Sequence, residues 1–153
     1  MADDSDVLLK FYEEQRIYGR QSEDQRATIT NIVLIVASAL LGFISQNKLF
    51  LTTLPLTILL IVIGIYGAVA SEKLYERFQL HDKRSKKLRD QIDKIHPNAY
   101  SLKLIFEADR EHKKEFPILQ KLRLHYLWLI LHLAIAVTGV ILTIIVIVYH
   151  SMP

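Results

Sequence analysis

The chain has 153 residues, a formal net charge of +3 at pH 7 and no cysteine. Without cysteine it cannot use disulfides, thiolate catalysis or thiolate metal ligands. Three long stretches contain no Asp, Glu, Lys or Arg, so all of the charge lies in the remaining parts of the chain. A single soluble domain would show a polar stripe along each helix, so this separation indicates a protein that lies in two solvents, water and lipid.

The first 26 residues predict a helix in front of the first uncharged stretch. Asp3, Asp4 and Ser5 suit a helix N-terminus, where hydrogen-bond acceptors and negative charge are favoured. Spacings of three and four residues then place six side chains on one line of this helix. These are Leu8, Phe11, Gln15, Tyr18, Ser22 and Gln25.

Each of the three uncharged stretches predicts a transmembrane helix. They cover residues 27–45, 50–70 and 126–149. A hydrocarbon core about 30 Å thick requires about 20 apolar residues at a rise of about 1.5 Å each. The sequence therefore predicts an all-α membrane protein with three transmembrane helices, of which the first two form a hairpin over residues 27–70.

The segment between the second and third spans, residues 71–125, predicts a helical hairpin in water. Residues 74, 78, 81, 85, 88, 92 and 95 repeat at alternating spacings of four and three, which is typical of a coiled-coil seam. Pro97 ends this helix, and Pro117 predicts a kink or a new start in the second arm. The two arms have matched lengths, so we expect them to form a three-helix cytoplasmic stalk with the N-terminal helix. The second arm has its own stripe, made of Ile105, Ala108, His112, Phe116, Leu119, Leu122 and Tyr126.

Four polar side chains fall at a similar depth in this predicted stalk, about 15–21 Å from the membrane at the helical rise per residue. They are Gln15, His81, Ser85 and His112. Such a layer fixes helix register, as a buried Asn does in coiled coils. A metal or proton-sensing site made by His81 and His112 is the alternative, although the sequence does not clearly supply further ligands.

The distribution of Lys and Arg predicts the orientation. Residues 71–125 contain fourteen Lys and Arg, whereas the loop at 46–49 between the first two spans contains one. Basic segments resist translocation and stay in the cytoplasm. We therefore expect a multi-pass protein of the cell membrane with a cytoplasmic N-terminus and an external C-terminus.

Two polar residues lie inside the predicted spans, Asn31 in the first and His132 in the third. Polar groups in lipid are costly unless they face a partner or water. A structural hydrogen bond is one interpretation, and a polar lining of a pore or of a subunit interface is the other.

Small residues in the spans predict where helices pack closely, because they let two backbones approach. Several of them are spaced four residues apart. The candidates are Ser38, Gly42, Gly64, Gly67, Ala68, Ala134 and Thr138.

Motifs for chemistry do not occur in the sequence. It has no phosphate-binding glycine loop, no zinc-protease motif and no nucleophile elbow. Basic residues are not interleaved with aromatic ones as in nucleic-acid-binding segments. We therefore expect no enzyme activity, no cofactor, no metal and no nucleic-acid partner.

The order of features resembles a known family over about residues 8–95. Tyr12, Arg16, Tyr18, Gly19 and Arg20 lie on a helix that leads into two close spans, and a charged helix over residues 72–94 follows. This arrangement is similar to the SLATT-type membrane proteins of bacteria and archaea. The resemblance implies an oligomeric effector that perturbs the membrane in nucleotide-linked defence.

Two functional hypotheses follow. The first is a homo-oligomeric membrane effector or channel-like protein, because three spans are too few to enclose a pore within one chain. The second is a membrane anchor or adaptor that docks a cytoplasmic protein on the stalk. An enzyme or transporter is disfavoured, because the spans lack internal repeats, broken helices and buried charges.

Overall fold

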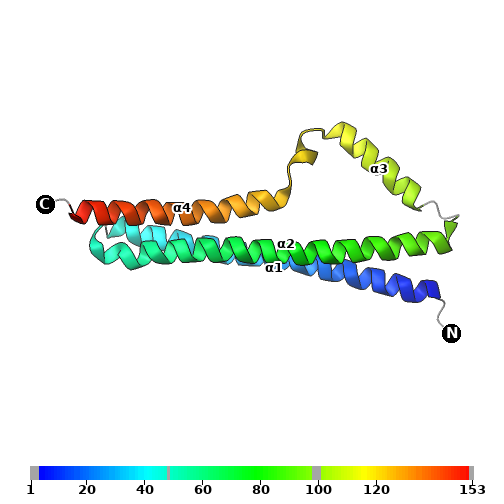
Figure 1. Cartoon of the computed structure of the whole chain (residues 1–153), viewed down its shortest axis with the longest axis horizontal. Coiled ribbons are helices and arrows are strands. Elements are labelled where there is room, and N and C mark those ends of the chain that lie inside the picture. Colours follow the sequence, from blue (N-terminus) through cyan, green and yellow to red (C-terminus); the bar gives the residue numbers. More distant parts are fainter. Residues whose placement is uncertain (1–3, 48, 98–100, 152–153) are drawn as a thin grey trace. The chain divides into compact units, whose positions relative to one another are not determined.

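The computed structural model describes residues 4–47, 49–97 and 101–151, and these form helices and no strand. The all-α prediction is thus confirmed for the described part of the chain. In chain order (Figure 1) the elements are α1 (Asp4–Gln46), the short 3-10 helix η1 (Leu51–Thr53), α2 (Leu54–Ile95), α3 (Ser101–Glu115), the 3-10 helix η3 (Leu119–Lys121) and α4 (Leu124–Ser151).

Three helices are long and apolar enough to cross a membrane, namely α1, α2 together with η1, and α4. The predicted spans at 27–45 and 50–70 are parts of longer helices, because α1 and α2 continue without interruption into charged sequence. The chain divides into two compact units. We call residues 25–74 and 124–153 the apolar unit, and residues 1–24 and 75–123 the charged unit.

The core of the apolar unit is built from α1, α2 and α4. Ala37, Leu40 and Leu60 are buried at its centre. Four half-buried side chains pack around them, and these are Leu56, Ile63, Ile135 and Leu142. Many large apolar side chains on the other faces of the three helices are exposed. Such a surface is unfavourable in water and suits lipid or protein contact.

In the charged unit, α2 turns its predicted seam inward as far as Ile92, whereas the last predicted position, Ile95, is exposed. Phe78, His81, Leu88 and Ile92 are half-buried and Ser85 is buried. The helix ends at Ile95, directly before the His-Pro pair that predicted its end.

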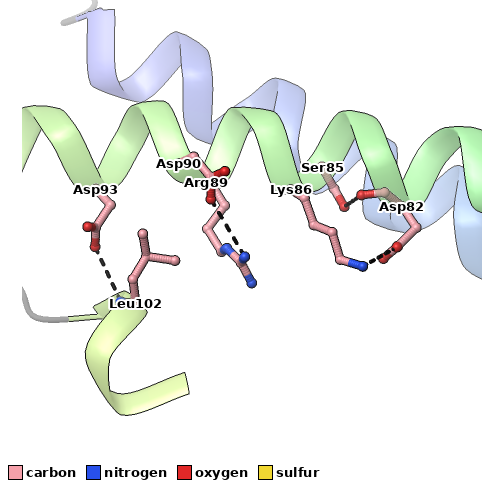
Figure 2. A network of polar contacts seen from close by, with 7 residues as sticks. All are labelled: Asp82, Ser85, Lys86, Arg89, Asp90, Asp93 and Leu102. Carbon is pink, nitrogen blue, oxygen red and sulfur yellow. Dashed lines mark hydrogen bonds and ion pairs between the residues drawn. The ribbon is translucent and has the colours of Figure 1, made fainter. Parts of the chain in front are cut away.

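Polar contacts along this part of α2 are drawn in Figure 2. Lys86 Nζ lies 2.6 Å from Asp82 Oδ2, one helical turn away, and the Ser85 hydroxyl donates to the Asp82 carbonyl at 2.9 Å. Asp93 Oδ1 accepts a hydrogen bond of 3.3 Å from the backbone N–H of Leu102, in the first turn of α3. This carboxylate satisfies one of the N–H groups that a helix leaves without an internal partner at its N-terminus.

The N-terminal part of α1 presents a different line of residues from the predicted one. Phe11, Tyr18 and Gln25 were expected to face inward with Leu8, Gln15 and Ser22, but all three are exposed. Tyr12 is half-buried and Gly19 is buried instead. A Cβ at Gly19 would lie 3.7 Å from the Phe78 ring. The small residue thus brings α1 close to α2, and this contact turns the larger neighbours outward.

The segment from Ser101 to Arg123, which we call the returning segment, differs from the predicted second arm of the stalk. Its helix α3 ends at Glu115, two residues before Pro117, and only the short helix η3 precedes α4. All side chains from Lys103 to Leu124 are exposed. The apolar stripe predicted on this arm is therefore not buried against the α1–α2 pair of the charged unit.

Candidate functional site: a buried polar cluster in the apolar unit

The most polar part of the apolar unit lies where its helices approach the charged sequence. Each of the three long helices contributes two residues spaced one helical turn apart, so both members of each pair share a face. We call these residues the buried polar cluster. They are Arg26 and Thr30 on α1, Gly67 and Ser71 on α2, and Trp128 and His132 on α4.

A hydrogen bond between α1 and α4 is the central contact of the cluster. Thr30 Oγ1 and His132 Nε2 are 3.1 Å apart, and both residues are fully buried. The Thr30 hydroxyl donates its single hydrogen to the Arg26 carbonyl at 3.0 Å. Thr30 Oγ1 must then accept from His132, so the histidine carries a hydrogen on Nε2 and its Nδ1 is an acceptor in the neutral ring.

Gly67 makes room for the imidazole on the third helix. A Cβ built at Gly67 would clash with His132 Nδ1, far inside van der Waals contact. One turn away, a Cβ at Gly64 would lie 2.6 Å from the backbone nitrogen of Ala136. The two glycines therefore let the α2 backbone lie directly against α4, as small residues do in membrane helix pairs.

Several buried polar atoms of this region have no hydrogen-bond partner among the described residues. They include Ser71 Oγ, Trp128 Nε1, His132 Nδ1 and one carboxylate oxygen of the adjacent Glu72. The guanidinium carbon of Arg26 lies 5.8 Å from the centre of the Trp128 ring, within cation–π range. Both donors and acceptors are thus left for a small polar guest such as water, which typically occupies such sites.

A second polar contact joins α2 and α4 further along. The hydroxyl oxygens of Thr57 and Thr143 are 2.8 Å apart, and Thr143 Oγ1 is also 2.8 Å from the Gly139 carbonyl. Thr57 donates to the Leu54 carbonyl at 2.9 Å, so its oxygen remains available as an acceptor. A Cβ at Gly139 would lie 2.8 Å from the Ile61 backbone nitrogen, which makes this a further close approach of the two helices.

The two polar residues predicted inside the spans lie in different surroundings. His132 is buried inside the apolar unit, whereas Asn31 is exposed on α1. The structure thus does not bring them together. Ser38 and Gly42 are also exposed on α1, and a Cβ at Gly42 would meet no atom within 4 Å.

The remaining small residues divide between the helix contact and the surface. Ala68 is buried on α2 beside Gly67. Ala134 is exposed on α4, and the half-buried Thr138 donates its hydroxyl to the Ala134 carbonyl. The face of α4 that packs inward carries Ala136 and Gly139, which lie two and one positions away from the predicted pair.

In the charged unit, the predicted polar layer contains a direct contact between α1 and α2. Gln15 Oε1 lies 2.9 Å from His81 Nδ1, which donates to it. The Tyr18 ring also lies against His81, with ring centres 5.5 Å apart. Ser85 is buried and bonded to its own helix, while His112 is exposed on α3 and contacts Phe116. His81 and His112 therefore do not form a shared site.

Two pKa values in this contact are shifted. Partial burial lowers the pKa of His81 from its usual 6.5, and the positive charges of Arg84 and Arg77 lower it further. The Tyr18 hydroxyl donates to Glu14 at 3.0 Å, and this bond raises the pKa of Tyr18. Among the described residues no group of His, Asp and Glu side chains is arranged to hold a metal ion.

Sequence reasoning did not select Arg26, Thr30, Ser71 or Trp128 as site residues. The usable signal was the recurrence of polar or small residues one turn apart at the same end of three apolar helices. No family model, curated protein or solved structure matches this chain.

Proposed function

We propose that this chain is a multi-pass membrane protein that acts as a homo-oligomeric effector or channel-like assembly. The observation that carries the proposal is a stripe on the exposed surface of α1 in which five of six positions are polar or small. At heptad spacing, exposed positions 28, 31, 35, 38, 42 and 45 hold Thr, Asn, Ile, Ser, Gly and Ser.

This stripe differs from both other faces of α1. The buried face carries Val33, Ala37, Leu40 and Ile44 against the rest of the apolar unit. A second exposed face carries large apolar side chains, and these are Ile32, Val36 and Phe43. A helix that met only lipid on its outside would not need two outer faces of such different chemistry.

Asn31 gives this stripe an energetic reason to meet a protein partner. Its amide makes no hydrogen bond to another described residue and is exposed, which is costly in hydrocarbon. A second copy of α1 can supply the partner, and Ser38 and Gly42, four residues apart, allow the two backbones to approach. The stripe is therefore proposed as the subunit interface, or as the polar wall of a pore enclosed by several copies.

The resemblance to SLATT-type proteins over residues 8–95 supports an effector role, in which the charged unit receives a signal and the assembled spans perturb the membrane. In the proposed orientation the charged unit lies in the cytoplasm as a stalk. The docking of a cytoplasmic protein on this unit is the second function we consider, favoured by its exposed returning segment.

The oligomer is tested by subunit counting in lipid bilayers, using fluorescently labelled chains at defined protein-to-lipid ratios. Asn31→Leu should weaken association about 3- to 20-fold, since hydrogen bonds between membrane helices contribute about 0.6–1.7 kcal/mol. Gly42→Leu should weaken it by preventing close approach. Val36→Leu, on the apolar outer face, is the matched control and should leave association unchanged. A wild-type chain that remains monomeric at all ratios contradicts the proposal.

The effector role is tested by measuring membrane potential after induced expression in cells. The wild type should depolarise the membrane, and Asn31→Leu should reduce the effect while Val36→Leu retains it. His132→Leu tests the second polar residue separately, because His132 is buried between the helices and does not belong to the exposed stripe. A cross-linked cytoplasmic partner without any change in ion leak would instead favour the adaptor.

A further inference from the structure

We propose that the returning segment, residues 101–123, is a membrane-surface element whose apolar side chains insert among lipid headgroups where α4 enters the bilayer. The proposal rests on the membrane insertion of α4 given above. Its ligand is a lipid surface that contains anionic headgroups.

The first observation is exposure. Every side chain from Lys103 to Leu124 is exposed, including large apolar ones on both sides of Pro117. Phe106 on α3 is 63% exposed, and Ile118 beyond it is 78% exposed. A run of such residues in water would be an unfavourable surface, so some apolar phase must cover it.

The second observation is the pattern of α3. At about 100° per residue, Leu102, Ile105 and Phe106 of α3 and Phe116 just after its end fall within one arc, which also contains Asp109 and Lys113. The other charged residues lie outside this arc, and these are Lys103, Glu107, Arg110, Glu111, Lys114 and Glu115. At 15 residues α3 is about 22 Å long and strongly charged on one side, so it cannot span a bilayer. A short, strongly amphipathic helix of this kind lies in the plane of the interface.

The third observation is the position of the segment in the chain. Arg123 is bonded directly to Leu124, the first residue of α4. The residues just before it are therefore held at the membrane surface wherever the rest of the charged unit lies. This continuity favours lipid as the occupant over a distant partner.

The charged residues of the returning segment are distributed in a way that suits an anionic lipid surface. The four acidic residues of the segment lie between positions 107 and 115. Lys113, Lys114, Lys121 and Arg123 lie in its last eleven residues, where Glu115 is the single acidic residue. Basic side chains next to a span attract anionic headgroups.

The backbone between α3 and α4 is also suited to the interface. The N–H groups of Gln120, Lys121 and Leu122 donate to the carbonyls of Phe116, Ile118 and Leu119 at 3.0–3.1 Å. These turn hydrogen bonds reduce the cost of placing an irregular segment next to lipid. A partner helix would instead require a regular seam, which the irregular residues 116–123 do not provide.

The test uses spin labels on single cysteines in the full chain, which has no native cysteine. Phe106→Cys and Ile118→Cys report the apolar side, and Arg110→Cys on the polar side is the matched control. The chain is placed at one copy per nanodisc, with either phosphatidylcholine alone or phosphatidylcholine with 30% phosphatidylserine. Collision with oxygen, which concentrates in lipid, is compared with collision with a water-soluble nickel chelate.

We expect the labels at 106 and 118 to favour oxygen at least threefold more than the label at 110, with a larger ratio in the anionic disc. Equal access of the nickel chelate at all three positions overturns the proposal. So does protection that appears only with several copies per disc, because the occupant is then a second chain. A fourth label at Ile141→Cys, on the exposed face of α4, distinguishes a failure of this proposal from a failure of membrane insertion. If this label is also accessible to the nickel chelate, α4 itself is not inserted in the membrane.

Discussion

At the scale of single residues, the packing of the apolar unit depends on its glycines as much as on its larger side chains. His132 reaches Thr30 across the bundle because Gly67 leaves its place on α2 open. The imidazole then fills the space of a side chain and adds a hydrogen bond between α1 and α4. One residue from each helix thus fixes the relative position of all three within this unit.

Gly67→Ala should destabilise the apolar unit. The new methyl would clash with His132 Nδ1, so the ring or a helix must shift. Overpacking of this kind costs about 1–3 kcal/mol, and thermal unfolding in mild detergent measures the loss. Gly42→Ala is the control, since its methyl meets no atom within 4 Å. Adding His132→Ala to Gly67→Ala should recover part of the loss, and no recovery would show that the clash lies elsewhere.

The Thr30–His132 hydrogen bond should be measurable by a double-mutant cycle. Thr30→Val removes the acceptor and leaves the buried Nε2–H without a partner, which costs about 1–3 kcal/mol. His132→Phe keeps a ring in the space beside Gly67. The coupling energy between the two changes should be about 0.6–1.7 kcal/mol, the range for hydrogen bonds between membrane helices. Additive effects of the two substitutions would contradict a direct bond.

At the scale of elements, the inward faces of α1 and α2 follow a heptad spacing in both units. From Thr53 in η1 to Ile92 in α2, every such position is buried or half-buried. The sequence predicted the charged part of this seam, because apolar residues there stand out against Lys, Arg and Asp. In the apolar part the seam is made of Thr57, Leu60, Gly64, Gly67 and Ser71, which hydrophobic patterning cannot distinguish from lipid-facing neighbours.

Because sequence patterns do not distinguish inward-facing from lipid-facing positions in the apolar helices, only some of the site residues could be predicted. Gly64 and Gly67 were selected because small residues favour close packing, and the structure places both against α4. Ala134 and Thr138 satisfy the same spacing but lie outside that contact, since spacing gives no information on which face of α4 turns inward. The three apolar helices themselves were predictable from length and composition alone.

Acid should weaken the pairing of α1 and α2 in the charged unit through His81. Its pKa is lowered in the folded chain, so between that value and the usual 6.5 the unfolded chain binds more protons. The stability contribution is therefore present above about pH 6.5 and is lost as the pH falls through the lower folded value. Protonated His81 would face Arg77 and Arg84 on α2, with Gln15 and Tyr18 opposite on α1.

Hydrogen exchange of residues 8–22 and 78–92, corrected for intrinsic rates between pH 8 and 5.5, measures this effect. Protection should fall on acidification in the wild type. His81→Gln keeps a donor for Gln15 without a titrating group, and its protection should change much less. An equal loss of protection in both proteins would assign the pH dependence to other groups.

At the scale of the whole molecule, charge and hydropathy assign the parts of the chain to different solvents. The apolar unit contains α4 and the apolar parts of α1 and α2, the three helices that are long and apolar enough to span a bilayer. The charged unit carries most of the Lys and Arg, and these residues resist translocation across a membrane. Both parts of the charged unit, residues 1–24 and 75–123, should therefore remain on the side of synthesis.

The resulting orientation is open to cysteine labelling, because the wild-type chain supplies no background. Glu13→Cys and Lys87→Cys, both exposed in the charged unit, should react with a membrane-impermeant maleimide only after cells are permeabilised. Asn47→Cys, between α1 and η1, and Ser151→Cys, at the end of α4, should react in intact cells. This pattern follows from an odd number of spans, which puts the two chain ends on opposite sides. Reaction of Glu13→Cys and Ser151→Cys from the same side would mean that one of the three apolar helices does not cross.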